Sequence, residues 1–301
     1  SMNKKSVQIG EKKSIFTNFG RQNSAVFFPV KKTILGIGVT DASEEKILES
    51  VVNFIEKSVK NAYIVTPNPE MVVESTRNFS FKTALNGADL ALCDGVGLFF
   101  AGQLTGSPLK SRIIGTNFVE RLCEKVSDRP ITVGFLGGRP GIAVSAAECL
   151  KKKYPKLLVG FAEENWGGLY QGPASTSPSV SAPSSRTSFN TVHAVGSLSS
   201  RVSLVQKNKP LDILFVAFGH PKQELWMAEH IDKIPVRVIM GVGGAFDQIV
   251  DSSLRAPSIV NSIGMGWLYR LIRQPWRIKR QLALVTFTLL VCKAILSGQK
   301  K

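Results

Sequence analysis

Apolar residues occur in short, nearly continuous runs through the middle of the chain, and amphipathic stretches separate these runs. Runs of this kind are typical of strands in a parallel sheet, because helices cover both faces of such a sheet. Between them the apolar residues have helical spacing, as in Ser43–Lys60. Strands that alternate with helices predict an α/β fold with a largely parallel sheet and helices on both faces. The predicted strands are Thr33–Val39, Ala62–Val65, Ala88–Cys93, Ile131–Leu136, Leu157–Phe161, Leu211–Phe218 and Val236–Met240.

The C-terminal region has a different pattern. Residues Trp267–Arg280 interleave aromatic, aliphatic and basic side chains, and the apolar stretch Leu282–Leu296 follows, interrupted by Lys293. A membrane-spanning helix needs roughly 20 apolar residues, and this stretch is shorter. The pattern therefore favours a basic amphipathic helical tail that lies on an anionic membrane surface. A helix that closes the core or a homo-oligomer interface is one alternative, and a true membrane span is another.

Two segments show neither pattern. Residues 1–32 are mostly polar and basic, without clear periodicity and without the long apolar region of a signal peptide. Residues 171–190 are rich in Ser, Pro, Ala and Thr, which predicts a disordered surface loop. We therefore expect a flexible basic segment at 1–32, an α/β domain at 33–254 that contains this insertion, and a basic, apolar appendage at 255–301.

Charge narrows the choice of partners. The formal net charge is +16 and the isoelectric point is near 9.8, which favours nucleic acid, an anionic membrane or a phosphorylated substrate. The charge is concentrated at the two ends, since every charged residue from Arg255 to Lys301 is Lys or Arg. The cysteines show neither C-x-x-C spacing nor a zinc pattern, so we expect a reducing cytoplasm and no disulfides. They are Cys93, Cys123, Cys149 and Cys292.

Polar clusters follow the first predicted strands. The carboxyl ends of parallel strands meet at one edge of a sheet, where ligands bind in such folds, so these clusters form a candidate site. Thr66 and Asn68 lie in the rigid, proline-containing segment Thr66–Glu70, and Asp94 and Gly95 follow the next strand. An aspartate in apolar surroundings has a raised pKa and suits general-base catalysis. A helix cap is the alternative role for both segments.

Glycine-rich clusters follow the later strands. Glycines let the backbone approach a ligand closely, and the helix N-terminus after them favours a phosphate. Lys222 and Gln223 can contact a diphosphate or a base, and Arg112 can neutralise a diphosphate, although solvated surface residues are the alternative for all three. The clusters are Gly134–Gly141 with Gly137 and Gly138, Phe218–Glu224, and Gly241–Asp247 with Gly243, Gly244 and Asp247.

The order and spacing of these motifs carry a resemblance. The motifs are Thr66–Glu70, Ala88–Gly97 (ADLALCDGVG), Arg112–Gly115, Gly134–Gly141, Phe218–Trp226 (FGHPKQELW), Gly241–Asp247, Arg255–Pro257 and Gly266–Arg270 (GWLYR). Together they resemble the WecG/TagA/CpsF family of glycosyltransferases. The resemblance covers about Thr33–Arg280 apart from the Ser/Pro-rich insertion, and agreement over so many motifs makes it specific.

This resemblance implies a Rossmann-like fold and a reaction. Family members transfer N-acetylmannosamine, its uronic acid or glucose from a UDP-sugar donor to a polyprenyl-diphosphate-linked saccharide, in cell-surface polysaccharide synthesis. The implied reaction is inverting and needs no metal or other cofactor. The tail is implied to hold the enzyme peripherally at the cytoplasmic face of the bacterial plasma membrane. Asp94 matches the implied catalytic base, and the residues that match other active-site positions are Thr66, Asn68, Arg112 and Gln223.

The residues themselves agree with this implication. An inverting transfer needs a base for the acceptor hydroxyl, which Asp94 can supply, and positive charge for the departing diphosphate, which Arg112 can supply. The chain contains no Asp-x-Asp, the usual carboxylate pair for a metal-bound nucleotide sugar. The Ser/Pro-rich insertion departs from the family pattern and leaves the acceptor side of the pocket in doubt.

Two other functions fit parts of the sequence. A Rossmann-type oxidoreductase or nucleotide-sugar epimerase shares the fold class but needs G-x-G-x-x-G after the first strand, and Gly36-Ile37-Gly38 lies inside that strand without a third glycine. A non-catalytic protein that binds nucleic acid or membrane would explain the basic tail and leave the strand-end motifs unexplained. We therefore expect the transferase, without a nucleic-acid partner.

Overall fold

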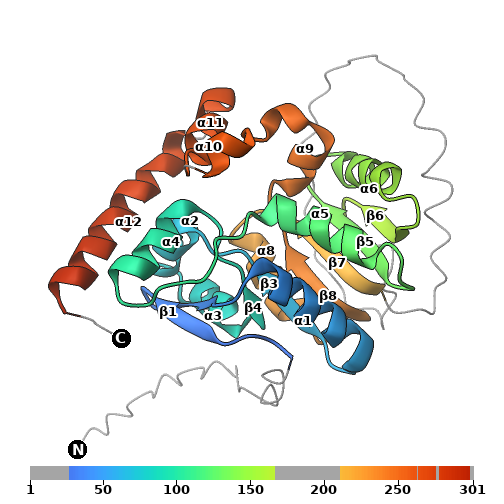
Figure 1. Ribbon diagram of the computed structural model, residues 1–301, viewed down its shortest axis with the longest axis horizontal. Helices are drawn as coiled ribbons and strands as arrows, with labels where there is room; N and C mark the ends of the chain where they lie inside the picture. Colours follow the sequence, from blue (N-terminus) through green and yellow to red (C-terminus); the bar gives the residue numbers. More distant parts are fainter. Residues whose placement is uncertain (1–26, 167–210, 263, 276–277, 299–301) are drawn as a thin grey trace, which may run out of the picture.

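A parallel six-stranded sheet forms the centre of the molecule (Figure 1). The structure is a computed structural model that describes residues 27–166, 211–262, 264–275 and 278–298. The strand order of the six-stranded sheet is β4-β3-β8-β7-β5-β6, and all its neighbouring strands are parallel, which confirms the predicted α/β class. The strands are β3 (Ala62–Val65), β4 (Leu90–Ala91), β5 (Thr132–Gly137), β6 (Leu158–Glu163), β7 (Leu211–Ala217) and β8 (Val236–Gly241).

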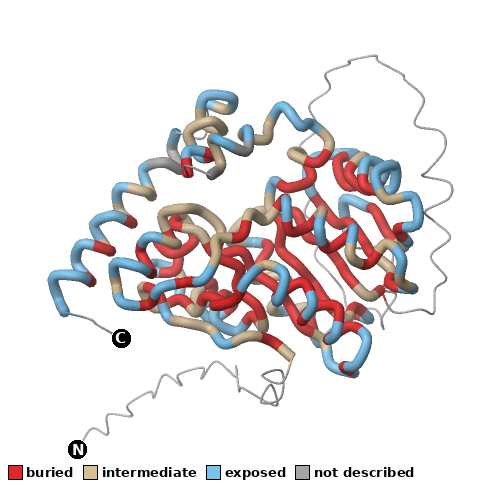
Figure 2. Tube along the Cα trace, viewed as in Figure 1, coloured by how far each residue is buried: buried red, intermediate tan, exposed pale blue. Residues whose placement is uncertain are grey.

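Helices cover both faces of this sheet, as predicted. Successive residues of a strand point to opposite faces, and along β7 Ile213 and Phe215 enter one hydrophobic core while Leu214 and Val216 enter the other. Buried residues accordingly concentrate in the sheet and on the inner sides of its helices (Figure 2). The first core contains α1 (Glu44–Lys57), α5 (Gly115–Val126), α6 (Ile142–Lys153) and α9 (Ala245–Val250); the second contains α2 (Pro69–Ser75), α3 (Phe79–Gly87), α4 (Val96–Leu104) and α8 (Lys222–His230).

The prediction of one strand at Thr33–Val39 is wrong. This region is an antiparallel hairpin of β1 (Lys31–Ile34) and β2 (Ile37–Thr40), separate from the main sheet. The two turn residues, Leu35 and Gly36, have φ of 49° and 80°, and a two-residue turn with positive φ at both positions reverses the chain. Leucine seldom adopts such a φ, so the residues at this position contain no turn signal.

The packed part of the chain begins before residue 33. The rings of Phe27 and Phe28 lie 5.5 Å and 4.8 Å from the ring of Phe54 in α1, and Phe28 is buried. The predicted N-terminal segment at 1–32 therefore contributes its last residues to the first core. Its residues 1–26 and the insertion predicted at 171–190 lie outside the described residues.

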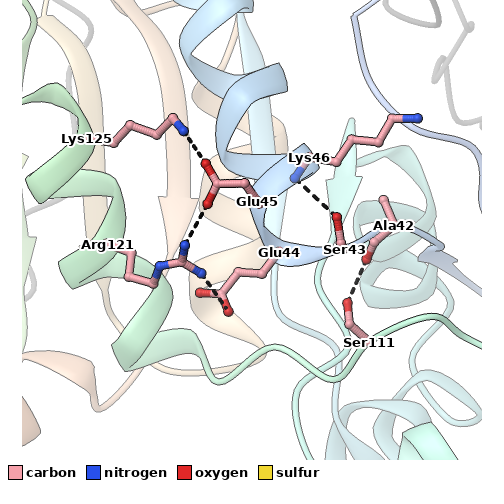
Figure 3. Close-up of polar contacts among 8 residues, drawn as sticks. All are labelled: Ala42, Ser43, Glu44, Glu45, Lys46, Ser111, Arg121 and Lys125. Carbon is pink, nitrogen blue, oxygen red and sulfur yellow. Dashed lines mark hydrogen bonds and ion pairs between the residues drawn. The ribbon is translucent and has the colours of Figure 1, made fainter.

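Polar contacts connect α1 to α5 (Figure 3). Glu45 accepts hydrogen bonds from Arg121 at 2.6 Å and from Lys125, and the backbone N–H of Lys46 donates to the capping Ser43 hydroxyl at 3.4 Å. The Ser111 hydroxyl donates to the Ala42 carbonyl at 2.6 Å. Solvent screens these exposed ion pairs, which add little stability, so the contacts mainly fix the relative position of the two helices. The Ser111–Ala42 hydrogen bond in particular holds the segment that leads into Arg112.

Short helices lead from α9 to a long C-terminal helix. Figure 1 shows α12 along one side of the molecule next to α2 and α4, and it packs against both. None of the described helices, α12 included, combines the length and apolar character that crossing a membrane requires. The elements are η3 (Ser252–Leu254), α10 (Ser258–Ser262), α11 (Gly266–Arg273) and α12 (Ile278–Leu296).

Candidate active site

A cavity of about 1720 Å³ opens at the carboxyl ends of the strands. Ligands bind at this edge in open parallel sheets, and residues at or just after the end of every strand of the main sheet line the cavity. The structure therefore brings all the predicted site residues together, although their chemical roles stay predictions. They are Thr66, Asn68, Asp94, Gly95, Arg112, Gly137, Gly138, Lys222, Gln223, Gly243, Gly244 and Asp247.

Asp94 lies between β4 and α4. Its N–H donates to the Pro67 carbonyl at 3.0 Å, and the carbonyl of Cys93 accepts from the Ile113 N–H at 2.9 Å. Gly95, with φ of 88°, is the N-cap of α4, and no side chain caps that helix. The alternative that Asp94 is a helix cap is thus not what the structure shows, and its carboxylate is available to the cavity.

The surroundings of Asp94 change its acidity. Burial raises the pKa of its carboxyl group, whereas the Arg270 side chain, the Gly95 N–H and the Arg112 side chain lower it, and Glu70 raises it. Burial prevails, so the pKa of Asp94 is above its usual value. A raised pKa makes the ionised carboxylate a stronger base, and the two arginines favour that ionised form.

The C-terminal segment supplies part of the cavity wall. Arg112, half-buried between β4 and α5, donates to the carbonyl of Asn261 in α10. Arg270 of α11 also lines the cavity and acts on Asp94. Arg255, by contrast, pairs with Glu120 and donates to the Gln248 carbonyl at 2.5 Å. Arg112 and Arg270 are thus the arginines that bear on the Asp94 carboxylate.

Asn68 combines two of the roles considered for its segment. Its Oδ1 accepts from the Met71 N–H at 3.0 Å and caps α2, so the helix-cap alternative holds for this residue. Asn68 also lines the cavity beside Asp94 and Gly95. Thr66 is largely buried at the end of β3 and lines the same wall.

The glycine-rich loop after β5 requires its glycines. Gly137 and Gly138 have φ of 90° and 87°, and a Cβ on Gly137 would lie 2.6 Å from Cδ1 of Phe218. The Gly141 N–H at the start of α6 donates to Oε1 of Glu164 at 2.9 Å, so a protein carboxylate already lies beside this helix terminus. The loop backbone reaches the cavity next to Glu164.

An ion pair joins the loops that follow β5 and β8. Nε of Arg139, after β5, lies 2.7 Å from Oδ1 of Asp247 in the first turn of α9. Both residues line the cavity, and Gly243 and Gly244 precede Asp247 in the β8–α9 loop. This side of the cavity therefore combines two glycine-containing loops with a charged pair.

Comparison with known proteins identifies the family. The model of the glycosyl transferase WecG/TagA/CpsF family matches residues 32–301. The chain belongs to this family. An N-acetylglucosaminyldiphosphoundecaprenol N-acetyl-beta-D-mannosaminyltransferase from Bacillus spizizenii is 28% identical over 235 residues, covering 78% of this chain and 80% of the relative. The Staphylococcus aureus (strain MW2) protein of the same name is 28% identical over 268 residues, covering 88% and 93%.

The chain is therefore a glycosyltransferase, which sets aside the oxidoreductase and the non-catalytic binding protein. Among the described residues, no group of three or more His, Cys, Asp or Glu side chains is placed to hold a metal ion. The basic residues that line the cavity include Arg112, Arg270 and Lys222, the last exposed at the start of α8.

Sequence reasoning missed several residues of the transferase site. Arg270 lies in a motif that carried the resemblance, but the motif gave no reason to place it beside Asp94. Asn261, which accepts from Arg112, belongs to no motif. Glu224 follows Gln223 and is completely buried, and the sequence pattern does not indicate that a glutamate at this position is buried.

Proposed function

We propose that this transferase moves a sugar from a UDP-sugar to a polyprenyl-diphosphate-linked saccharide with inversion and without a metal ion. The observation that carries the proposal is the Asp94 carboxylate with a raised pKa, in a cavity at the strand ends that Arg112 and Arg270 also line. A base and neighbouring positive charges are what such a displacement requires.

The proposed reaction is a single displacement. Asp94 accepts the proton of the acceptor hydroxyl while that oxygen forms a bond to the anomeric carbon of the donor. The bond from this carbon to the diphosphate breaks, and its electron pair leaves with UDP. Arg112, Arg270 and the backbone N–H of Gly244 stabilise the charge that develops on the diphosphate.

The names of the relatives support a particular substrate pair. They describe transfer of an N-acetyl-β-D-mannosaminyl group to N-acetylglucosaminyldiphosphoundecaprenol. A β product from an α-linked UDP-sugar requires one inversion at the anomeric carbon. We propose N-acetylmannosamine as the first donor sugar to test for this chain, ahead of its uronic acid and glucose.

The outer face of α12 supports a peripheral position on the membrane. Leu282, Val285 and Leu289 are 67%, 62% and 65% exposed, whereas Phe287 and Val291 are buried against the body and line the cavity. Apolar side chains on one helix face, in a basic segment, suit the interface of an anionic membrane. We propose that α12 rests on the cytoplasmic face of the plasma membrane, where it would bring the cavity close to a lipid-linked acceptor. A second copy of the chain is the alternative partner for this face.

The proposal is tested by UDP release. The assay compares a panel of UDP-sugars with a short-chain polyprenyl-diphosphate-N-acetylglucosamine acceptor. We expect acceptor-dependent release by the wild type, a loss of about 100-fold or more in Asp94→Asn, and unchanged release in Asp128→Asn, an exposed surface control. Full activity of Asp94→Asn would refute its role as base, and no release with any donor would refute the proposed reaction.

A further inference from the structure

The amide of Gln223 is engaged at both ends. The Gly243 N–H donates to its Oε1 at 2.9 Å, and its Nε2 donates to Oε1 of Glu224 at 2.7 Å. A Cβ on Gly241 would lie 2.5 Å from this Nε2, so the amide lies directly against the end of β8. With only 3% of its surface exposed, Gln223 connects the first turn of α8 to the β8–α9 loop.

Glu224 completes this connection from a fully buried position. Its residue is 0% exposed, and its Oε2 has no hydrogen-bond partner among the described residues. A buried carboxylate with so few partners is strongly unfavourable, whereas a neutral carboxylic acid is much less so. Burial raises the pKa of Glu224, and the Gln223 amide and the backbone N–H of Glu224 itself oppose this effect.

The ionisable groups on the elements packed against α8 contact residues other than Glu224. α8 packs against α3, β3 and β8, which carry Lys82, Tyr63 and Arg237 respectively. Arg237 donates to the carbonyls of Ile55 and Ser58, and the Tyr63 hydroxyl donates to the Ala84 carbonyl. Lys82 is placed against the turn at Gly36. None of these three groups is a cause of the pKa shift of Glu224.

The other titratable groups on α8 and in the nearby cavity do not counteract the effect of burial on the pKa of Glu224 either. On α8, Glu229 pairs with Lys233, and Nδ1 of His230 lies 2.9 Å from the Trp226 carbonyl. Lys222 is exposed at the helix start. In the cavity, His220 lies 3.8 Å from Glu70, and Arg270 and Arg112 act on Asp94. Glu224 therefore faces the Gln223 amide without a cationic partner in the part of the chain that the structure describes.

We propose that Glu224 is a positioning residue that, as a neutral carboxylic acid, fixes the orientation of the Gln223 amide and through it the Gly243–Gly244 loop that binds the donor diphosphate. The binding role of the loop rests on the proposed function. Oε1 of the Glu224 side chain accepts from Nε2 of Gln223, which leaves Oε1 of Gln223 directed at the Gly243 N–H. Without that acceptor the amide is free to turn, and two N–H donors then face each other at Gly243.

The test measures UDP affinity by calorimetry as a function of pH. Glu224→Leu removes the acceptor and should weaken binding about tenfold, the size expected for one buried hydrogen bond. Glu224→Gln keeps a neutral acceptor and should bind within about twofold of the wild type at neutral pH. In the wild type, affinity should fall as pH rises through the raised pKa of Glu224, because the ionised carboxylate, which lines the cavity, would repel the anionic diphosphate, and Glu224→Gln should lack this decrease. The matched control is Glu229→Gln, an exposed glutamate on the same helix, which should behave as the wild type throughout.

Two ligand-free measurements separate this inference from the proposed function. The infrared spectrum of the wild type minus Glu224→Gln should contain the stretch of a protonated carboxyl group, and the Gly243 N–H should exchange faster in Glu224→Leu than in Glu229→Gln. Wild-type affinity and pH dependence in Glu224→Leu would overturn the proposal, and so would a missing infrared band. If the wild type binds no UDP while both ligand-free results appear, the donor role fails and the positioning of the loop by Glu224 stands.

Discussion

Removing the Phe287 side chain should release α12 from the body of the transferase. Phe287 is 4% exposed, and a Cβ on Gly97 of α4 would lie 3.7 Å from its ring, so it fills the contact between the two helices. Val291 and Ala294 are the other buried apolar residues in the described part of α12. Truncating a buried phenylalanine costs about 3–5 kcal/mol, which corresponds to an increase of at least about 100-fold in the open population of a locally unfolding helix.

Hydrogen exchange measures this opening directly. In Phe287→Ala the amides of α12 should exchange about 100-fold faster or more, while those of β7 should keep wild-type protection, because α12 lies outside the sheet. Leu289→Ala is the matched control on the same helix: Leu289 is 65% exposed, and a surface truncation should change stability by no more than about 0.5 kcal/mol. Equal exchange of α12 in the two variants would refute the packing argument.

Two further predictions concern the loop after β5 and the base. Gly137→Ala should lower the free energy of unfolding by about 2–5 kcal/mol, since it adds backbone strain at φ of 90° to a clash with Phe218; a denaturant midpoint equal to that of the wild type would contradict this. Because Arg270 lowers the pKa of Asp94, Arg270→Met should raise that pKa, and the acidic limb of the kcat/KM profile should move to higher pH. The base works in its ionised form, so a limb that stays in place or moves to lower pH would show that Arg270 does not act on Asp94.

Strands that the sheet buries on both faces were predicted well. Ala62–Val65 has the observed bounds of β3, and the predictions for β5, β7 and β8 are within one residue at each end. Burial on both faces leaves a continuous apolar run, which is the signal that the pattern contains. β4 is shorter than its run Ala88–Cys93, because only Leu90 and Ala91 form the strand and the residues on either side lie in the connections to α3 and α4. The hairpin at Leu35–Gly36 was missed because neighbouring structure, and not the preference of leucine, imposes its positive φ.

The location of the site could be predicted from the sequence, but the contacts among its residues could not. Parallel strands bring their carboxyl ends together whatever their order, so the motifs alone predicted which residues would meet. The approach of Arg270 to Asp94 depends on how α11 folds back over the strand ends, and no local pattern encodes that path. The partners of Gln223 could not be predicted either, because the sequence does not distinguish an amide buried between Gly243 and Glu224 from a solvated one.

The position of β6 bears on how this chain can vary. β6 is the edge strand of the main sheet, paired with β5 alone, and the chain leaves it at Glu163 to return at Leu211 in the interior strand β7. A residue inserted within β6 would disturb its pairing with β5 alone, whereas one inserted within β3 or β8 would disturb pairings on both sides. The edge at β6 is thus where natural selection, or a protein engineer, can change the chain with the least effect on the sheet, and because Glu164 lies in the cavity wall, such a change also reshapes that wall.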